Sequence, residues 1–139
     1  MTVIFADALS HLESGRQAAL AMWQSDLVNA NYQSEVRIFE LFEVLTWLTM
    51  PAVGRPANSI IVARLGDCNA EGRISNNEEL AAFCLIVQAR RVAQLGDAND
   101  AQRLLTLATR LNASSANSLS ARWGLNFRQE MVFMPQKYN

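Results

Sequence analysis

The chain has 139 residues, of which half are hydrophobic and 18% are charged, and its formal net charge is −1. This apolar content excludes an intrinsically disordered chain, and the lack of any basic cluster beyond Arg90–Arg91 argues against binding to nucleic acid. A chain of this length is typical of one domain that buries an ordinary apolar core.

The first predicted helix covers residues 6–32, where apolar residues recur mostly at three- and four-residue spacing. The pair Ser14–Gly15 is a possible break in it. The preceding segment, TVIFA, fits either a short strand or an extended lead. Ser34 is suited to cap a second helix, because a serine side chain can accept a hydrogen bond from a free backbone N–H.

The second predicted helix covers residues 35–49 and should lie in the core. Its polar stripe is narrow, with only Arg37, Glu40 and Glu43, and the other faces are apolar. A helix on a membrane surface would instead carry Lys and Arg on its polar face. We expect the most buried side chains to include Phe39, Phe42, Leu45 and, from a later helix, Phe83.

The remaining elements follow from breakers and periodicity. The stretch 50–58 is a loop with two prolines and a glycine, and 59–66 is a short helix or strand. Helices are predicted over 76–95 and 100–112, with a turn at 95–100 between them. The predicted fold is therefore all-α, a compact helical bundle.

One polar stretch, GDCNAEGRISNNEE at residues 66–79, has the spacing of a metal-binding loop. Counted from Asp67, oxygen ligands fall at positions 1, 3, 5, 7, 9 and 12, with a glycine at position 6. Over residues 67–78 the chain resembles the EF-hand family, which binds Ca²⁺. The resemblance implies six ligands: Asp67, Asn69, Glu71, Arg73 through its carbonyl, Ser75 and Glu78. Glu71 is longer than the usual residue at its position, and Gly66 and Glu79 replace the apolar residues that usually flank such a loop.

The same stretch also fits a turn that needs no ion. Ser75 and Glu78 have the spacing of a capping box at the start of a helix. Asp67, Asn69 and Gly72 are ordinary turn residues. The sequence leaves both interpretations open, and Ca²⁺ is the one possible cofactor.

The candidates for catalysis are few. The chain has one histidine, His11, and two cysteines, Cys68 and Cys84. Cys68 lies in the polar stretch and would be reactive if exposed, whereas Cys84 stands among apolar residues and is expected in the core. Neither a phosphate-binding loop nor a nucleophile motif is present, so we expect no enzyme.

The C-terminal segment changes period. Residues 112–120 are rich in Ser, Asn and Ala, and apolar residues then alternate as in a strand. We therefore expect a helical body over 1–112 and a hinge with an extended, strand-like arm over 113–139. The candidate partner-binding residues are Arg122, Trp123, Leu125, Phe127, Arg128, Met131 and Phe133.

Together these features favour a non-enzymatic structural subunit of a larger protein assembly. The arm would dock to a neighbouring chain, in a homo-oligomer or large complex such as one that uses small adaptors or connectors in a virus particle. Two alternatives stay open: the arm covers its own body, or the protein is a calcium-binding module. No membrane span is expected, since no apolar run reaches about 18 residues. A poor disulfide framework and an N-terminus unlike a signal peptide suggest a cytoplasmic protein, or one incorporated into an assembly made there.

Overall fold

A computed structural model of the chain describes residues 3–114. These residues form five α-helices and, within that range, no strand, which confirms the all-α prediction. The chain divides into two compact units, Met1–Asn76 and Asn77–Asn139, here called unit 1 and unit 2. The predicted division into a body over 1–112 and an arm over 113–139 stays a prediction, because nearly all of the arm lies outside the described residues.

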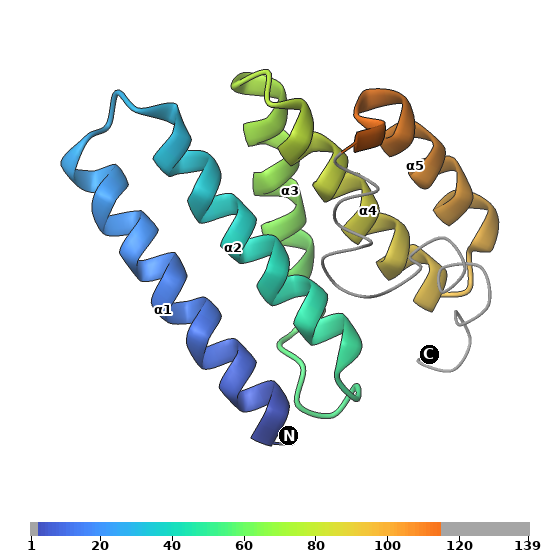
Figure 1. Ribbon diagram of the computed structural model, residues 1–139. Helices are drawn as coiled ribbons and strands as arrows, with labels where there is room; N and C mark the ends of the chain where they lie inside the picture. The colour runs from blue at the N-terminus through green and yellow to red at the C-terminus, as the bar shows by residue number, and fades with distance from the viewer. Residues whose placement is uncertain (1–2, 115–139) are drawn as a thin grey trace. The chain divides into compact units, whose positions relative to one another are not determined.

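Unit 1 is built on three helices, α1 (Val3–Ser25), α2 (Ala30–Thr49) and α3 (Asn58–Ile74). Helix α2 is central, since it packs against both α1 and α3. In Figure 1 the three helices alternate in direction, so that the α1–α2 turn and the C-terminal end of α3 lie at the same end of the unit.

The start of unit 1 differs from the prediction in three places. TVIFA is neither strand nor extended lead, since the helix already begins at Val3, and it continues without a break through Gly15. The helix ends instead at Ser25, where the α1–α2 turn begins. Helix α2 begins at Ala30, because the Asn29 side chain caps it by accepting a hydrogen bond from the N–H of Asn31. Ser34 is therefore not a cap but a buried residue within α2.

The loop over residues 50–57 appears where proline and glycine predicted it. Arg55 fastens it by donating hydrogen bonds to the carbonyl oxygens of Leu48 and Met50, at 2.8–3.0 Å. These carbonyls belong to the C-terminal end of α2, where acceptors lack partners within the helix. The arginine thus supplies the end of α2 with donors and a positive charge, which the helix dipole favours.

The most buried side chains of α2 agree with the prediction only in part. The prediction holds for Leu45, which is fully buried, but Phe39 and Phe42 are only half-buried. The residues of α2 that the structure buries completely or nearly so are Leu41, Val44, Leu45 and Leu48.

Unit 2 contains a hairpin of α4 (Glu78–Gln94) and α5 (Ala98–Leu111), which pack against each other. Phe83 is buried, as predicted. The turn between the helices is a Schellman motif: the N–H of Gly96 donates to Ala93 O and that of Asp97 to Val92 O. Gly96 has a φ of 97°, which a residue with a side chain rarely adopts.

Across residues 3–114, no helix combines the length and the apolar character that crossing a bilayer requires.

Candidate functional site

The predicted calcium ligands do not form a loop. Helix α3 continues through residue 74, so Asp67, Asn69, Glu71 and Arg73 are helical. Residues two apart on an α-helix point about 200° apart around its axis, so consecutive members of this set lie on different faces. The Asp67 side chain is exposed, whereas Glu71, about one turn further along α3, is buried. Among the described residues, no three His, Cys, Asp or Glu side chains gather as a metal ion would require.

The predicted turn and capping box are also misplaced. The turn is confined to residues 75–77, and Asn76 there adopts a φ of 53°. Ser75 is the C-cap of α3 and donates its hydroxyl to Glu71 O at 2.6 Å. The N-cap of α4 is Asn77, whose side chain accepts from the N–H of Leu80 at 3.1 Å. Glu78 lies in the first turn of α4, where a negative charge is favoured.

The one histidine and the two cysteines, which were considered as candidates for catalysis, differ in their burial. His11 is exposed on α1. Cys68 is fully buried in α3, with its thiol 3.4 Å from Arg37 O, so the prediction of a loop cysteine is wrong. Cys84 is buried as predicted, and burial raises the pKa of its thiol to about 12. A thiol with so high a pKa is a poor nucleophile at neutral pH.

The densest polar arrangement in the described chain is an ion-pair network inside unit 1. Glu40 and Glu43 of the polar stripe of α2 are both buried. Arg64 of α3 bridges them, with Nη1 3.0 Å from Glu40 Oε2 and 3.2 Å from Glu43 Oε1. Glu40 also pairs with Arg37 at 2.6 Å, and Glu43 lies 3.1 Å from Nε of Arg16 on α1.

Each of the three helices therefore contributes an arginine to the same two carboxylates. Burying a carboxylate is costly unless it is paired, and here each has two cationic partners. The Arg64 guanidinium also lies 5.7 Å from the centre of the Trp47 ring, within the range of a cation–π contact. We call the set Arg16, Arg37, Glu40, Glu43 and Arg64 the buried charge network.

The protonation behaviour of the network follows from these contacts. Burial is the largest influence on Glu43 and raises the pKa of its carboxyl, although Arg64 and Arg16 act in the opposite direction. Burial would lower the pKa of Arg37, but the bond to Glu40 and nearby negative charges raise it overall. At the rim of the network, Arg16 donates to Glu13; that bond lowers the pKa of Glu13 and raises that of Arg16. Both buried carboxylates are thus occupied by arginines, an arrangement suited to holding helices together.

The sequence did contain a signal for this network. Two glutamates three residues apart, in a helix that is apolar on its other faces, cannot both reach water when that helix is central. They require cations from neighbouring elements. Their identity as Arg16 and Arg64 depends on how α1 and α3 pack, and no local pattern encodes that packing.

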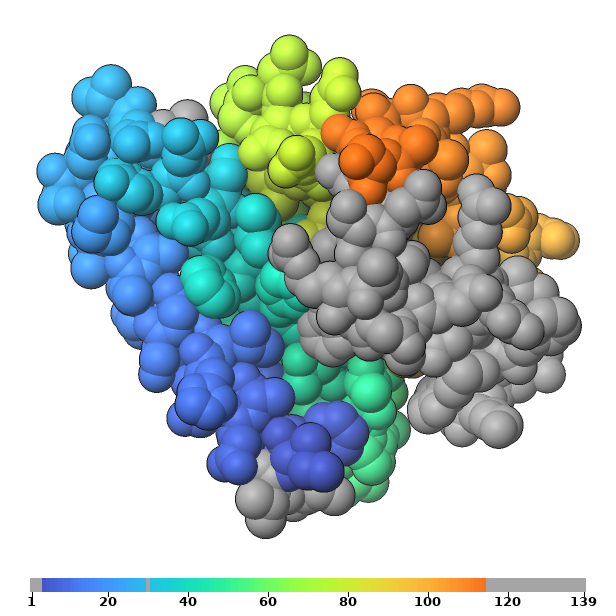
Figure 2. All heavy atoms as spheres, in the orientation of Figure 1, coloured from blue at the N-terminus to red at the C-terminus, as the bar shows by residue number. Residues whose placement is uncertain are grey.

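A second feature of unit 1 is a group of exposed apolar side chains at one end. Leu27 and Val28 in the α1–α2 turn are 71% and 94% exposed, and Ile74 at the end of α3 is 85% exposed. Cys68 is level with Arg37, and α2 and α3 run in opposite directions, so six residues further along α3 brings Ile74 level with the start of α2. We call Leu27, Val28 and Ile74 the apolar end of unit 1; in Figure 2 the α1–α2 turn (blue to cyan) forms an outer corner of the surface.

The predicted partner-binding residues, from Arg122 to Phe133, lie outside the described residues. Comparison of the chain with models of protein families, with curated proteins and with solved structures found no match.

Proposed function

We propose that the protein is a non-enzymatic subunit of a protein assembly and that residues 121–139 dock it to a neighbouring chain. An adaptor or connector of a virus particle, made in the cytoplasm, would have this kind of role. The observation that carries the proposal is the change of period near residue 121, where apolar residues begin to alternate with polar ones. A single strand is unstable in water and must pair with something.

The described residues support this proposal in two ways. Large apolar side chains stand exposed at the end of unit 1, and exposed apolar groups of this kind often mark contacts with other proteins. The buried charge network ties α1, α2 and α3 together with groups that are already paired, which suits a rigid building block.

The experiment compares the full chain with one that ends at residue 120. Sedimentation velocity gives the mass of each, and circular dichroism gives its helix content. We expect the full chain to form oligomers or to co-purify with a partner, and the shortened chain to remain folded and monomeric. If the shortened chain unfolds and the full chain is always a monomer without a partner, the arm only covers its own body and the proposal fails.

Calcium binding is the alternative function, and the ligand spacing from Asp67 to Glu78 is the observation that favours it. To form the loop, α3 would have to unwind from Asp67 to Ile74. Calcium binding therefore predicts a calorimetric signal at millimolar Ca²⁺ together with a loss of helical circular dichroism. Titration without heat would exclude it, and Asp67→Asn, which removes the first ligand charge, is the matched control.

A further inference from the structure

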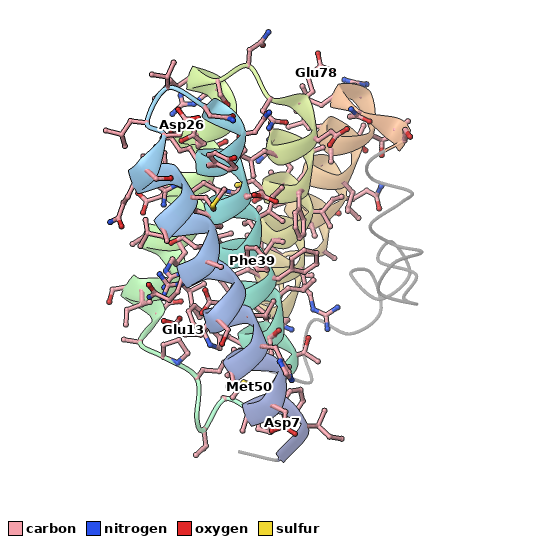
Figure 3. The ribbon with its side chains drawn as sticks, turned by 60° about the vertical axis from the view of Figure 1, so that its left-hand side comes forward. Asp7, Glu13, Asp26, Phe39, Met50 and Glu78 are labelled. Atoms are coloured by element: carbon pink, nitrogen blue, oxygen red, sulfur yellow. The ribbon has the colours of Figure 1, made fainter. Side chains whose placement is uncertain are left out.

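The charged residues around the apolar end of unit 1 indicate what kind of partner this surface binds. Its three apolar residues are accompanied by two exposed carboxylates, Asp26 in the same turn and Glu35 on α2. Figure 3 shows Asp26 at this end of the unit and Met50 toward the other. The complementary partner is an apolar segment that carries positive charge.

The charge of unit 1 as a whole points the same way. Met1–Asn76 contains eight Asp and Glu against five Arg, a difference of −3. Three of those arginines belong to the buried charge network, and Arg55 is bonded to the carbonyls of α2. Arg73 is the exposed arginine of the unit. Most of the positive charge is thus directed inward, and the outer surface is left predominantly acidic.

The last 25 residues have the opposite character. Residues 115–139 contain Arg122, Arg128 and Lys137 against one acidic residue, Glu130, a difference of +2. Trp123, Leu125 and Phe127 alternate between the two arginines, so in an extended chain they would share one face. The eight residues from 115 to 122 reach up to about 28 Å when extended, at roughly 3.5 Å each. That length is enough for the segment to cross to another molecule.

We propose that the apolar end of unit 1 receives residues 121–133 of a second copy of this chain, with Arg122 and Arg128 near Asp26 and Glu35. This inference rests on the proposed function and names the partner of the arm. A chain that carries both a donor segment and an acceptor surface associates head to tail, which produces closed rings or open filaments. Such growth is what an assembly subunit requires.

The test uses two full-length variants that each lose one half of the contact. Val28→Asp places a charge in the apolar end of unit 1 and leaves the arm unchanged. The double variant Trp123→Asp, Phe127→Asp places charges in the arm and leaves the apolar end of unit 1 unchanged. We expect each variant to be monomeric by sedimentation velocity, and an equimolar mixture of the two to form a one-to-one dimer, because one good arm then meets one good end.

The control is Val53→Asp, at a residue that is 90% exposed in the 50–57 loop, away from the apolar end. It should self-associate within threefold of the wild-type affinity, whereas Val28→Asp should weaken self-association at least tenfold. A charge exchange gives a second readout: Asp26→Arg and Arg122→Glu should each weaken association, and the doubly exchanged chain should recover it.

Several outcomes would overturn the proposal. If the mixture of the two variants forms no dimer, the arm does not bind the end of a second copy. If Val28→Asp associates as tightly as Val53→Asp, the acceptor lies elsewhere. If the arm variant abolishes association or partner binding but Val28→Asp does not, the proposed function still stands and only this inference fails. If the wild-type chain neither associates nor binds a partner, both fail.

Discussion

Gly15 lies in the middle of α1, at a position where a larger residue would meet α2. A Cβ built there would be 2.7 Å from Cζ of Phe39 and closer still to Cε1. Contacts this short do not occur in folded proteins, so the ring would have to move. The glycine therefore sets how closely α1 and α2 approach, and Phe39 remains half-buried at their border.

We predict opposite effects from two glycine substitutions. Gly15→Ala gains about 1 kcal/mol of helix propensity but overpacks the α1–α2 contact, which costs about 1–3 kcal/mol, so unfolding should become easier. Gly66→Ala is the matched control, because a Cβ built there, on the exposed face of α3, has no atom within 4 Å apart from its chain neighbours and the backbone of its own helix. It should stabilise by about 0.5–1 kcal/mol. Urea unfolding measures both, and equal effects of the two changes would show that the close approach at Gly15 is wrong.

Glu43 gives a prediction about pH. Because burial raises the pKa of Glu43 in the folded state, the folded chain binds this proton more tightly than the unfolded chain does. Its contribution to stability therefore increases as the pH falls from the raised value toward that of an unfolded glutamate. The free energy of unfolding of the wild type, minus that of Glu43→Gln, should rise on acidification through this window. Glu35→Gln, at an exposed glutamate of the same helix, controls for the loss of one carboxylate. A difference that decreases on acidification would contradict the burial of Glu43.

At the scale of the element, the observed helix starts differ from those that the sequence predicted. The structure assigns the start of α4 to Asn77, and Asp97 caps α5 by accepting from the N–H of Asp100 at 2.9 Å. Asn77→Ala and Asp97→Ala should each cost about 0.5–2 kcal/mol. Ser75→Ala should cost less, since Ser75 only donates back to Glu71 O. Thermal unfolding of the three variants decides this, and a Ser75 variant as unstable as the Asn77 variant would restore the capping box.

The tripeptide Leu-Gly-Asp shows why local sequence could not place these ends. At 95–97 it terminates α4 and caps α5, but at 65–67 it lies within α3. The difference is in the apolar pattern around it. Leu65 is buried and the buried face of α3 continues beyond it to Cys68, whereas Leu95 is exposed. Packing against α2 thus keeps a glycine and an aspartate helical where turn chemistry predicted a loop.

The buried charge network connects three helices. The effect of removing it on the free energy of unfolding should depend on which of its residues are replaced. Arg64→Met leaves two buried carboxylates with one cation fewer each. Its cost should approach the roughly 3–5 kcal/mol of a broken buried pair, reduced by the partial exposure of Arg64. Replacing Arg16, Glu43 and Arg64 together by Met, Leu and Met removes Glu43 with both of its cations and leaves Glu40 paired with Arg37. This triple change should lower the free energy of unfolding by less than Arg64→Met does. If the triple variant is instead the less stable of the two, the network contributes net stability and the reasoning from desolvation fails.

At the scale of the molecule, the sequence predicted the class of fold and most of the helices. The narrow polar stripe of α2 correctly indicated a central helix, and prolines located the loop at 50–57. What it could not predict depended on contacts between distant residues: the pairing of Arg16 and Arg64 with Glu43, and the close approach at Gly15. A carboxylate looks the same in sequence whether water or an arginine 21 residues away satisfies it. The arm and its partner remain predictions, because they concern residues outside those described.

The predominance of arginine in the ion pairs has a practical consequence for labelling chemistry. Every cation in residues 3–114 apart from His11 is an arginine, and the one lysine of the chain is Lys137. Among the side chains of this sequence an amine-acylating reagent therefore has one target, Lys137, and the N-terminal amine serves as an internal reference. If the arm docks on another molecule, the acylation rate of Lys137 should fall upon assembly while that of the N-terminal amine changes little, and mass spectrometry can follow both. An unchanged ratio of the two rates in the assembled state would mean that this part of the arm remains open to solvent.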